Sequence, residues 1–219
     1  GGAAPLGARF PLGCHDERRR LSCGVPNHPI ELPVTFDLLA VPANRRAAIE
    51  AMAHELVAGR KVALSTHLNA DGDGCGSESA LARMLAARGL EVRIVNPTPW
   101  PDMFDFLLGD DFANMTSKGA RGLRDIDLLI VLDISDVTRL GNLTDAVRAL
   151  TVPKLVIDHH LASDAPAGPN GLGEPTSCPT AALVYHVAPA SGVLVPLALA
   201  HRWATTQSSH PHVRLRLPT

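Results

Sequence analysis

Cysteine, net charge and long apolar runs are all scarce in this sequence, and each scarcity argues against a class of protein. The 219 residues include 4 cysteines (Cys14, Cys23, Cys75 and Cys178), which are spread too widely for a disulfide framework. We therefore expect reduced thiols and a cytoplasmic protein. The formal net charge of −2 argues against a polybasic surface for long nucleic acid or membrane. No apolar run reaches the roughly 18 residues of a membrane helix, so we expect no membrane partner.

Carboxylates are missing from the last part of the chain. No Asp or Glu occurs from Pro175 to Thr219, and beyond about residue 200 the sequence loses all helical or strand periodicity. The first residues, 1–41, are rich in Gly, Pro and Arg and predict a disordered N-terminal extension. We therefore expect one ordered domain over residues 42–200, followed by an aperiodic tail over 201–219.

Between these ends, short apolar runs alternate with amphipathic segments. Strands are predicted over residues 61–66, 91–95, 127–133 and 154–157. Helices are predicted over residues 45–58 with Asn44 as the cap, 77–88 with Ser77 as the cap, 103–108, 142–150 and 177–190. The alternation predicts an α/β fold, a parallel β-sheet with helices on both faces. The run 127–133 is apolar on both faces and is typical of a central strand.

A polar cluster follows the first predicted strand. If the loop curls, the side chains of His67 and Asp71 can reach the same position, and Asp73 can point at a second metal beside it. The intervening glycines allow tight turns and close backbone approach to a phosphate, and the predicted helix start at Ser77 is a natural anion site. An Asp-Gly turn followed by a capping serine explains the same residues, so both interpretations stay open for this cluster alone.

A second cluster closes the strand over 127–133. Asp133 ends a wholly apolar run, and a buried carboxylate is costly there unless it is paired or bound to a metal. A helix cap or a salt bridge to Arg139 is the alternative explanation. That structural role suits the neighbouring Asp136 better than Asp133.

The third cluster is Asp158-His159-His160, at the end of the strand over 154–157. Ligands of open α/β sheets bind at the carboxyl ends of the strands, so we expect the three clusters to converge on one divalent-metal site. Carboxylate oxygens with imidazoles and no cysteine favour Mn²⁺ or Mg²⁺ over structural zinc. Two such ions ~4 Å apart can clamp a phosphate, activate a water and stabilise the leaving oxygen.

Together, these three elements resemble the DHH phosphoesterase family. The matching residues are His67-x-x-x-Asp71-x-Asp73, Asp133 with its Ser-Asp and Arg-Leu-Gly sequel, and Asp158-His159-His160. The layout looks most like the nanoRNase and 3′-phosphoadenosine-5′-phosphate phosphatase group, which uses two Mn²⁺ ions. The resemblance implies a phosphoesterase acting on a short oligonucleotide or small nucleotide. Pyrophosphate, cyclic dinucleotides and single-stranded nucleic acid are the alternative substrates.

The resemblance also implies a role for each metal-site residue. His67 and Asp71 would hold one metal ion. Asp73 and His159 would hold the other, and Asp133 would bridge both.

The remaining two residues would act beside the metals. Asp158 would orient or support the neighbouring histidine, and His160 would face the scissile phosphate and steady it or the leaving group. Two family features have no counterpart: a further ligand Asp, absent beyond Asp164, and a C-terminal substrate-binding domain. We therefore expect a truncated or frame-shifted product, with an inactive remnant that binds metal or nucleotide weakly as the alternative.

Overall fold

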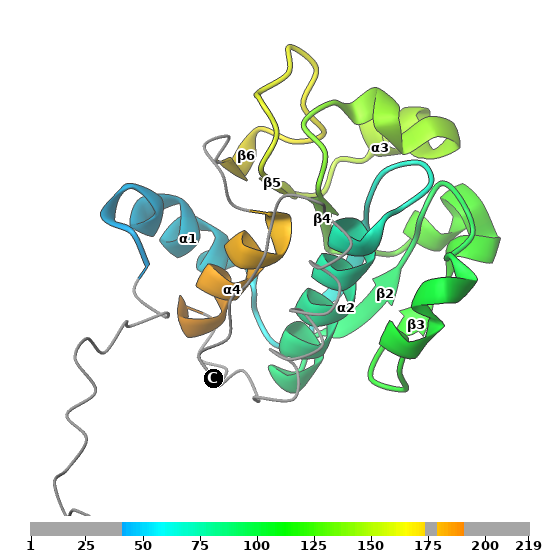
Figure 1. Cartoon of the computed structure of the whole chain (residues 1–219), viewed down its shortest axis with the longest axis horizontal. Helices are drawn as coiled ribbons and strands as arrows, with labels where there is room; N and C mark the ends of the chain where they lie inside the picture. The colour runs from blue at the N-terminus through cyan, green and yellow to red at the C-terminus, as the bar shows by residue number, and fades with distance from the viewer. Residues whose placement is uncertain (1–40, 174–178, 191–219) are drawn as a thin grey trace, which may run out of the picture. The chain divides into compact units, whose positions relative to one another are not determined.

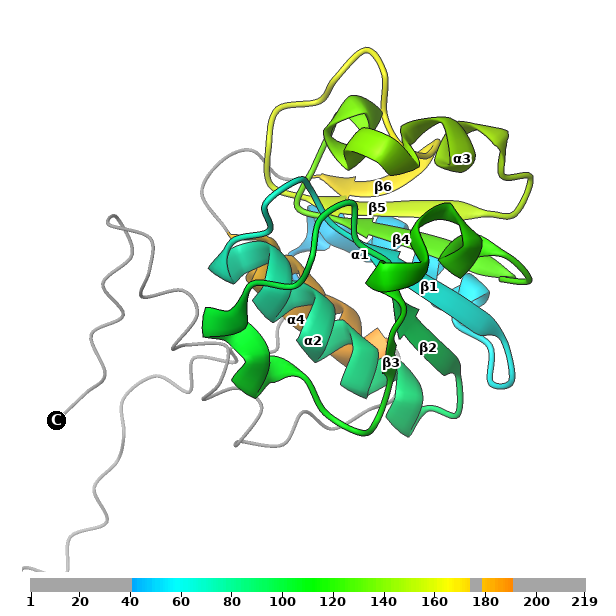
Figure 2. The same cartoon turned by 90° about the vertical axis from the view of Figure 1, so that its right-hand side faces the viewer.

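The computed structural model describes residues 41–173 and 179–190, and within them six parallel strands form one sheet. The strand order is β3-β2-β1-β4-β5-β6 (Figures 1 and 2). The strands are β1 (Lys61–Ser65), β2 (Glu91–Ile94), β3 (Ala113–Asn114), β4 (Leu128–Leu132), β5 (Lys154–Asp158) and β6 (Asn170–Gly173). Except for Val41, the predicted extension over 1–41 and the tail over 201–219 lie outside the described residues.

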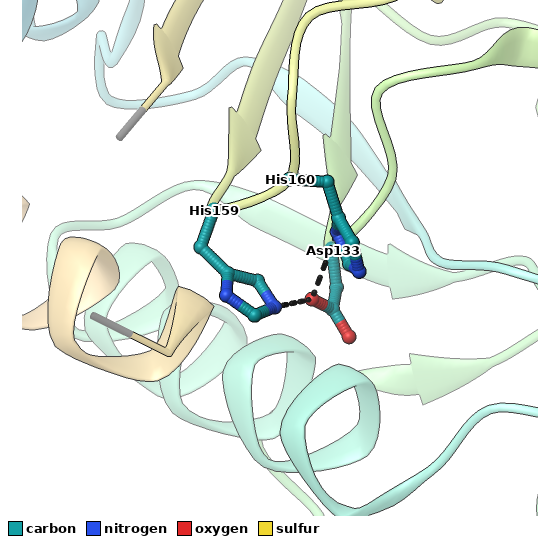
Figure 3. A group of neighbouring side chains, drawn as sticks. All are labelled: Asp133, His159 and His160. Atoms are coloured by element: carbon teal, nitrogen blue, oxygen red, sulfur yellow. Dashed lines mark ion pairs between the residues drawn. The ribbon is translucent and has the colours of Figure 1, made fainter. Parts of the chain in front are cut away.

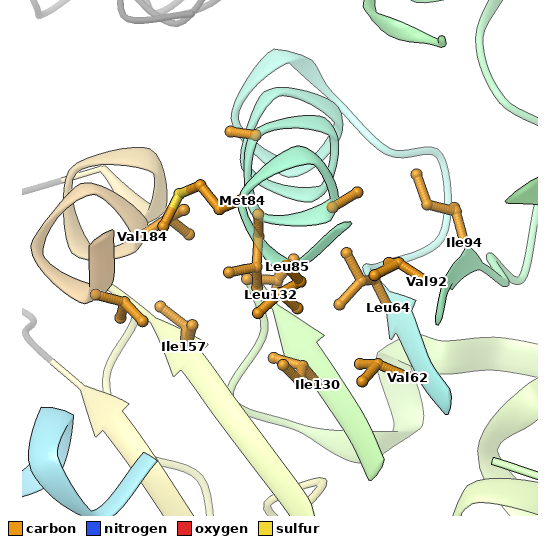
Figure 4. Close-up of a cluster of buried hydrophobic side chains, with 14 of the residues drawn as sticks. Val62, Leu64, Met84, Leu85, Val92, Ile94, Ile130, Leu132, Ile157 and Val184 are labelled. Carbon is orange, nitrogen blue, oxygen red and sulfur yellow. The ribbon is translucent and has the colours of Figure 1, made fainter. Parts of the chain in front are cut away.

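The central strand β4 shows how the sheet divides the core into two layers. All five of its side chains are buried, because successive residues point to opposite faces and both faces are covered. Leu128, Ile130 and Leu132 join one apolar cluster, shown in Figure 4. Leu129 and Val131 join the other. The predicted parallel sheet with helices on both faces is therefore confirmed.

The helices cover the two faces unequally. Side chains of α1 (Ala43–Glu55), α2 (Gly72–Ala87) and α4 (Thr180–Ala190) pack into the first cluster. The second cluster is covered by α3 (Thr144–Ala149) and by the 3₁₀ segments η2 (Thr116–Leu123) and η3 (Val137–Leu143). A further 3₁₀ segment, η1 (Asp102–Leu107), replaces the short α-helix predicted over 103–108. Among the described residues no helix combines the length and apolarity needed to cross a bilayer.

Two predicted helix starts are wrong. Helix α2 begins at Gly72 rather than Ser77, because the Asp71 carboxylate accepts hydrogen bonds from the backbone N–H groups of Asp73 and Gly74 and so caps the helix five residues earlier. Helix α1 begins after Pro42, not after Asn44, and has no side-chain cap. Gly72, Gly74 and Gly76, which lie between Asp71 and Ser77, are therefore part of the first turns of α2.

The segments after β4 and β5 also differ from the prediction. The helix expected over 142–150 is confined to α3, because residues 142 and 143 belong to the 3₁₀ segment η3, which is kinked at Gly141 (φ +52°). Strand β6 lies in a stretch where no strand was predicted, since its sequence has no apolar run. The chain just before β6 approaches β5 closely: a Cβ on Gly168 would lie 2.7 Å from the Lys154 carbonyl oxygen, which only glycine tolerates.

The strand order reverses between β1 and β4. From β1 the chain proceeds outward through β2 and β3, then returns to place β4 on the other side of β1. In open parallel sheets, ligands bind outside the carboxyl ends of the strands at such a switch point. His67 follows β1 and Asp133 follows β4, so both residues lie at this point.

Candidate metal centre

Asp133 lies at the centre of the candidate site. It follows β4 directly, its side chain is 3% exposed, and its backbone adopts a φ of +63°. That left-handed conformation is uncommon for a residue with a side chain and persists where the surroundings impose it. The Asp133 N–H donates to the Ile157 carbonyl at 2.9 Å, which ties this unusual turn to the adjacent strand β5.

The two carboxylate oxygens of Asp133 face different histidines. Its Oδ2 lies 3.5 Å from Nε2 of His67, and its Oδ1 lies 3.3 Å from Nε2 of His159. The Thr180 hydroxyl, from the first residue of α4, donates to Oδ1 at 2.9 Å. Figure 3 shows that one oxygen of the Asp133 carboxylate faces both His159 and His160. One carboxylate therefore joins residues that follow β1 and β5 to the start of α4.

Asp71 and His67 form one side of the site. The His67 ring hydrogen bonds through Nδ1 to the Leu68 carbonyl at 2.8 Å, which leaves Nε2 directed at Asp133. Nε2 also lies 3.9 Å from Oδ1 of Asp71. His67, Asp71 and Asp133 offer one donor atom each within 4.8 Å of one another. Asp71 is half exposed, so this side of the site opens to solvent.

Asp73 forms the opposite side and has a second role. Its carboxylate accepts from the backbone N–H groups of Thr180 at 2.9 Å and of Ala181 at 3.0 Å. It therefore caps the N-terminus of α4, where a negative charge interacts favourably with the helix dipole. Its Oδ2 lies 3.7 Å from Nε2 of His159. A carboxylate oxygen has two lone pairs, so capping leaves capacity toward a cation.

His160 and Asp158 are joined by a hydrogen bond. The Nδ1–H of His160 donates to Oδ1 of Asp158 at 2.7 Å, which is the short distance of a charge-assisted bond. The residue that Asp158 supports is thus His160 rather than the adjoining His159. The His160 side chain is 40% exposed, and its Nδ1 lies 3.9 Å from Oδ1 of Asp133. Asp133, His159 and His160 form a second group of donors within 4.8 Å.

The histidines stabilise negative charge on Asp133. Burial alone would raise the pKa of Asp133, but hydrogen bonds from His159, His67 and Thr180 hold it well below its usual range. Burial lowers the pKa of His67, yet its bonds to Asp133 and Leu68 outweigh this and the pKa is raised. The hydrogen bond to Asp133 raises the pKa of His159 against the opposing effect of burial. Positive charge is therefore favoured on both sides of Asp133.

The pKa of Asp73 is shifted in the opposite direction to that of Asp133. Burial, followed by the nearby charge of Asp133, raises the pKa of Asp73 to about 6, although the N–H groups of Ala181 and Thr180 oppose the shift. The buried carboxylates of Asp73 and Asp133, with the His159 imidazole in contact with both, form a site where added positive charge is stabilising. The donors are oxygen and imidazole nitrogen, which suits Mn²⁺ or Mg²⁺. Cys75 is buried, and burial raises the pKa of its thiol, so it contributes no thiolate.

The structure brings together all the residues that the sequence singled out for the site. It adds residues that sequence reasoning missed, chiefly Thr180, whose hydroxyl contacts Asp133 and whose N–H contacts Asp73. A threonine at a predicted helix start was visible in the sequence, but its contact with a residue 47 positions away was not. Asp136 has the structural role expected for it, since its carboxylate accepts from the Thr138 N–H at 2.8 Å and caps η3.

Comparison with solved structures places the fold among known proteins. An exopolyphosphatase-related protein from Bacteroides fragilis superposes with a TM-score of 0.66 at 22% identity, over 74% of this chain and 49% of that one. Exonuclease RecJ bound to manganese gives a TM-score of 0.49 at 20% identity, over 78% and 44%. RecJ with Mn²⁺ from Thermus thermophilus gives 0.49 at 23%, over 77% and 24%. The chain thus spans less than half the length of each of these proteins.

A match to a family model accounts for the three polar clusters together. The model described as "DHH family, N-terminal domain" matches residues 61–205, a range that includes every residue of the candidate site and well over half of the chain. The exopolyphosphatase-related structure has the same fold. The chain belongs to the DHH family, and the family's N-terminal-domain model covers residues 61–205.

Proposed function

We propose that this chain carries the two-metal hydrolytic site of a phosphoesterase that acts on short oligonucleotides or small nucleotides such as 3′-phosphoadenosine-5′-phosphate. The observation that carries the proposal is the position of Asp133, whose two oxygens face His67 and His159 from opposite sides. A carboxylate with a separate donor group at each oxygen is suited to bridge two cations. The net charge of −2 favours a short substrate over a long nucleic acid.

The donor groups suggest which residues would hold each ion. His67 and Asp71 would hold one Mn²⁺ or Mg²⁺, and Asp73 and His159 would hold the other, with Asp133 shared. When bound, the ions would neutralise the phosphate charge and activate a water for attack. Thr180 would keep the Asp133 carboxylate in the orientation that serves both sides, because its hydroxyl already donates to Oδ1.

His160 is suited to handle the proton of the leaving group. Its Nδ1–H is held by Asp158, and this bond fixes the ring orientation. A partly exposed imidazole beside the site can carry a proton to the departing oxygen of a phosphoester. Asp158 would thus act through His160, in the orienting role proposed for it.

Hydrolysis of a small phosphodiester by the purified full chain, with and without added Mn²⁺, tests this function. We expect Mn²⁺-dependent turnover of bis(p-nitrophenyl) phosphate and of a dinucleotide, with pyrophosphate and a cyclic dinucleotide in the panel to define the substrate class. Asp133→Ala and His159→Ala should each reduce the rate by at least about a hundredfold, in the range found when groups acting directly in catalysis are removed.

The matched control is His54→Ala, which removes an exposed histidine from the last turn of α1. It should leave both turnover and Mn²⁺ affinity unchanged. A folded protein that shows no Mn²⁺-dependent turnover on any substrate of the panel would refute the proposed activity. Unchanged Mn²⁺ affinity in Asp133→Ala would refute the bridging role of that carboxylate.

A further inference from the structure

Glu78 is a buried carboxyl group on α2 that is not one of the candidate metal ligands. It lies on α2 and is 0% exposed, with no Lys or Arg bonded to it among the described residues. Its Oε2 accepts a 2.8 Å hydrogen bond from the side-chain amide of Asn96, and its Oε1 is buried without a partner in the same part of the structure. A buried carboxyl group in such surroundings is costly, so its retention calls for a reason.

Asn96 connects Glu78 to the end of β1. Its Oδ1 accepts from the backbone N–H of Thr66 at 3.1 Å, and its own N–H donates to Oγ1 of Thr116 at 3.1 Å. Because Oδ1 is committed to an N–H donor, the amide nitrogen of Asn96 must face Glu78 and needs an acceptor there. Glu78 supplies that acceptor and thereby fixes the orientation of the Asn96 side chain.

Thr66 extends the connection to β4. Its hydroxyl donates to the Leu132 carbonyl at 2.9 Å, and the pair is fully buried. Thr66 precedes His67 in the chain, and Leu132 precedes Asp133. One series of hydrogen bonds therefore runs from Glu78 through Asn96 and Thr66 to the two backbone segments that carry His67 and Asp133.

We propose that Glu78 is a positioning residue of the metal centre, which acts through Asn96 and Thr66 to hold His67 at its working distance from Asp133. The inference rests on the proposed metal site and extends it to residues that touch neither metal nor substrate. Outer partners of metal ligands orient the ligands and raise affinity by reducing the reorganisation that binding requires. Here the outer partner acts on the backbone at the switch point of the sheet rather than on a ligand side chain.

The chemical form of Glu78 suits this task. Burial raises its pKa to about 8, although the Asn96 bond opposes the shift, so the group is a neutral carboxylic acid at pH 7. A neutral acid still offers a carbonyl oxygen to Asn96 and adds no further negative charge near Asp133. Glutamine offers the same acceptor at the same reach, which makes Glu78→Gln the conservative variant. Leucine has similar bulk and no acceptor.

Mn²⁺ affinity of the full chain, measured by electron paramagnetic resonance titration of free Mn²⁺, tests the inference. We expect Glu78→Leu to weaken Mn²⁺ binding by about tenfold or more, and Glu78→Gln to stay within about twofold of wild type. Ser79→Ala is the matched control, because Ser79 is buried one residue further along α2 and its hydroxyl donates to Leu107 in η1, away from the site. It should alter stability but not Mn²⁺ affinity.

Thr66→Val provides a second variant in case Glu78→Leu does not fold. It keeps the branched shape and removes only the hydroxyl that bonds to Leu132, so we expect weaker Mn²⁺ binding by about severalfold. Wild-type affinity in a folded Glu78→Leu or Thr66→Val protein would overturn the positioning role. So would an equal loss in Glu78→Gln and Glu78→Leu, because the charge rather than the acceptor would then matter. Failure of the metal site itself is distinguishable, since wild type would then bind no Mn²⁺.

Discussion

The Thr180 hydroxyl donates a 2.9 Å hydrogen bond to Oδ1 of Asp133, and the Thr180 N–H donates to Asp73. The first residue of α4 therefore contacts both buried carboxylates of the candidate metal centre. This arrangement links the docking of α4 to the geometry of the site. A side-chain substitution at Thr180 can therefore remove the hydrogen bond to Asp133 and leave the backbone hydrogen bond to Asp73 in place.

Thr180→Val should weaken Mn²⁺ binding by about tenfold, because Asp133 loses the donor that fixes its orientation. The backbone N–H of residue 180 still donates to the Asp73 carboxylate, which caps α4. The loss of stability should therefore be only about 1 kcal/mol, as for one buried hydrogen bond. Titration of Mn²⁺ and thermal unfolding measure the two effects. Thr180→Ser, which keeps the hydroxyl, is the control. Equal Mn²⁺ affinity in the valine and serine variants would contradict the role of the hydroxyl.

Asp133→Asn should lower the pKa values of both His67 and His159 in the metal-free protein. The Asp133 carboxylate raises both values in the wild type, and the neutral amide removes that attraction while the effect of burial remains. Titration of the imidazole signals by nuclear magnetic resonance measures the change. Asp136→Asn is the control, because Asp136 bonds to Thr138 and Ser163 instead. Histidine pKa values that do not move in Asp133→Asn would show that the contacts are weaker than the distances imply.

Glu78 should make the metal-free protein less stable as pH rises. Its folded pKa of about 8 lies above the ordinary value of 4.5, so the folded state binds more protons than the unfolded state between these values. This contribution to stability is complete below about pH 4 and is lost as pH rises through about 8. Chemical unfolding across this range should therefore show a decline, on the order of a few kcal/mol, that Glu78→Gln removes. A wild type and a Glu78→Gln variant with parallel profiles would show that Glu78 titrates normally.

Gly74→Ala should destabilise the protein even though alanine favours helices. In an exposed helix the change would stabilise by about 1 kcal/mol. Here a Cβ on Gly74 would lie 2.8 Å from Oγ1 of Thr66, so either α2 or the end of β1 must shift, at a cost of about 1–3 kcal/mol. Thermal unfolding measures the sign. In a Thr66→Ala background the same change should be tolerated, and a double-mutant cycle without coupling would exclude the contact.

Local patterns in the sequence were sufficient for the longer strands and for the chemistry of their ends. The apolar run within 127–133 predicted the buried central strand β4, and the carboxylate that ends it predicted Asp133 as a site residue. The start of α2 was missed because the Asp71 cap depends on side-chain geometry that a glycine-rich sequence does not reveal. Strand β6 was missed because its pairing with β5, and not its composition, makes it a strand.

The sequence by itself determined which residues would form the candidate site and at which edge of the sheet they would lie, because parallel strands present their carboxyl ends to one side. Only the tertiary structure decided that β1 and β4 are neighbours, since strand order depends on long-range packing of the apolar faces. That adjacency sets Asp133 between His67 and His159. It also connects Glu78, Asn96 and Thr180 to the site from α2, the end of β2 and α4, through contacts that no local pattern contains.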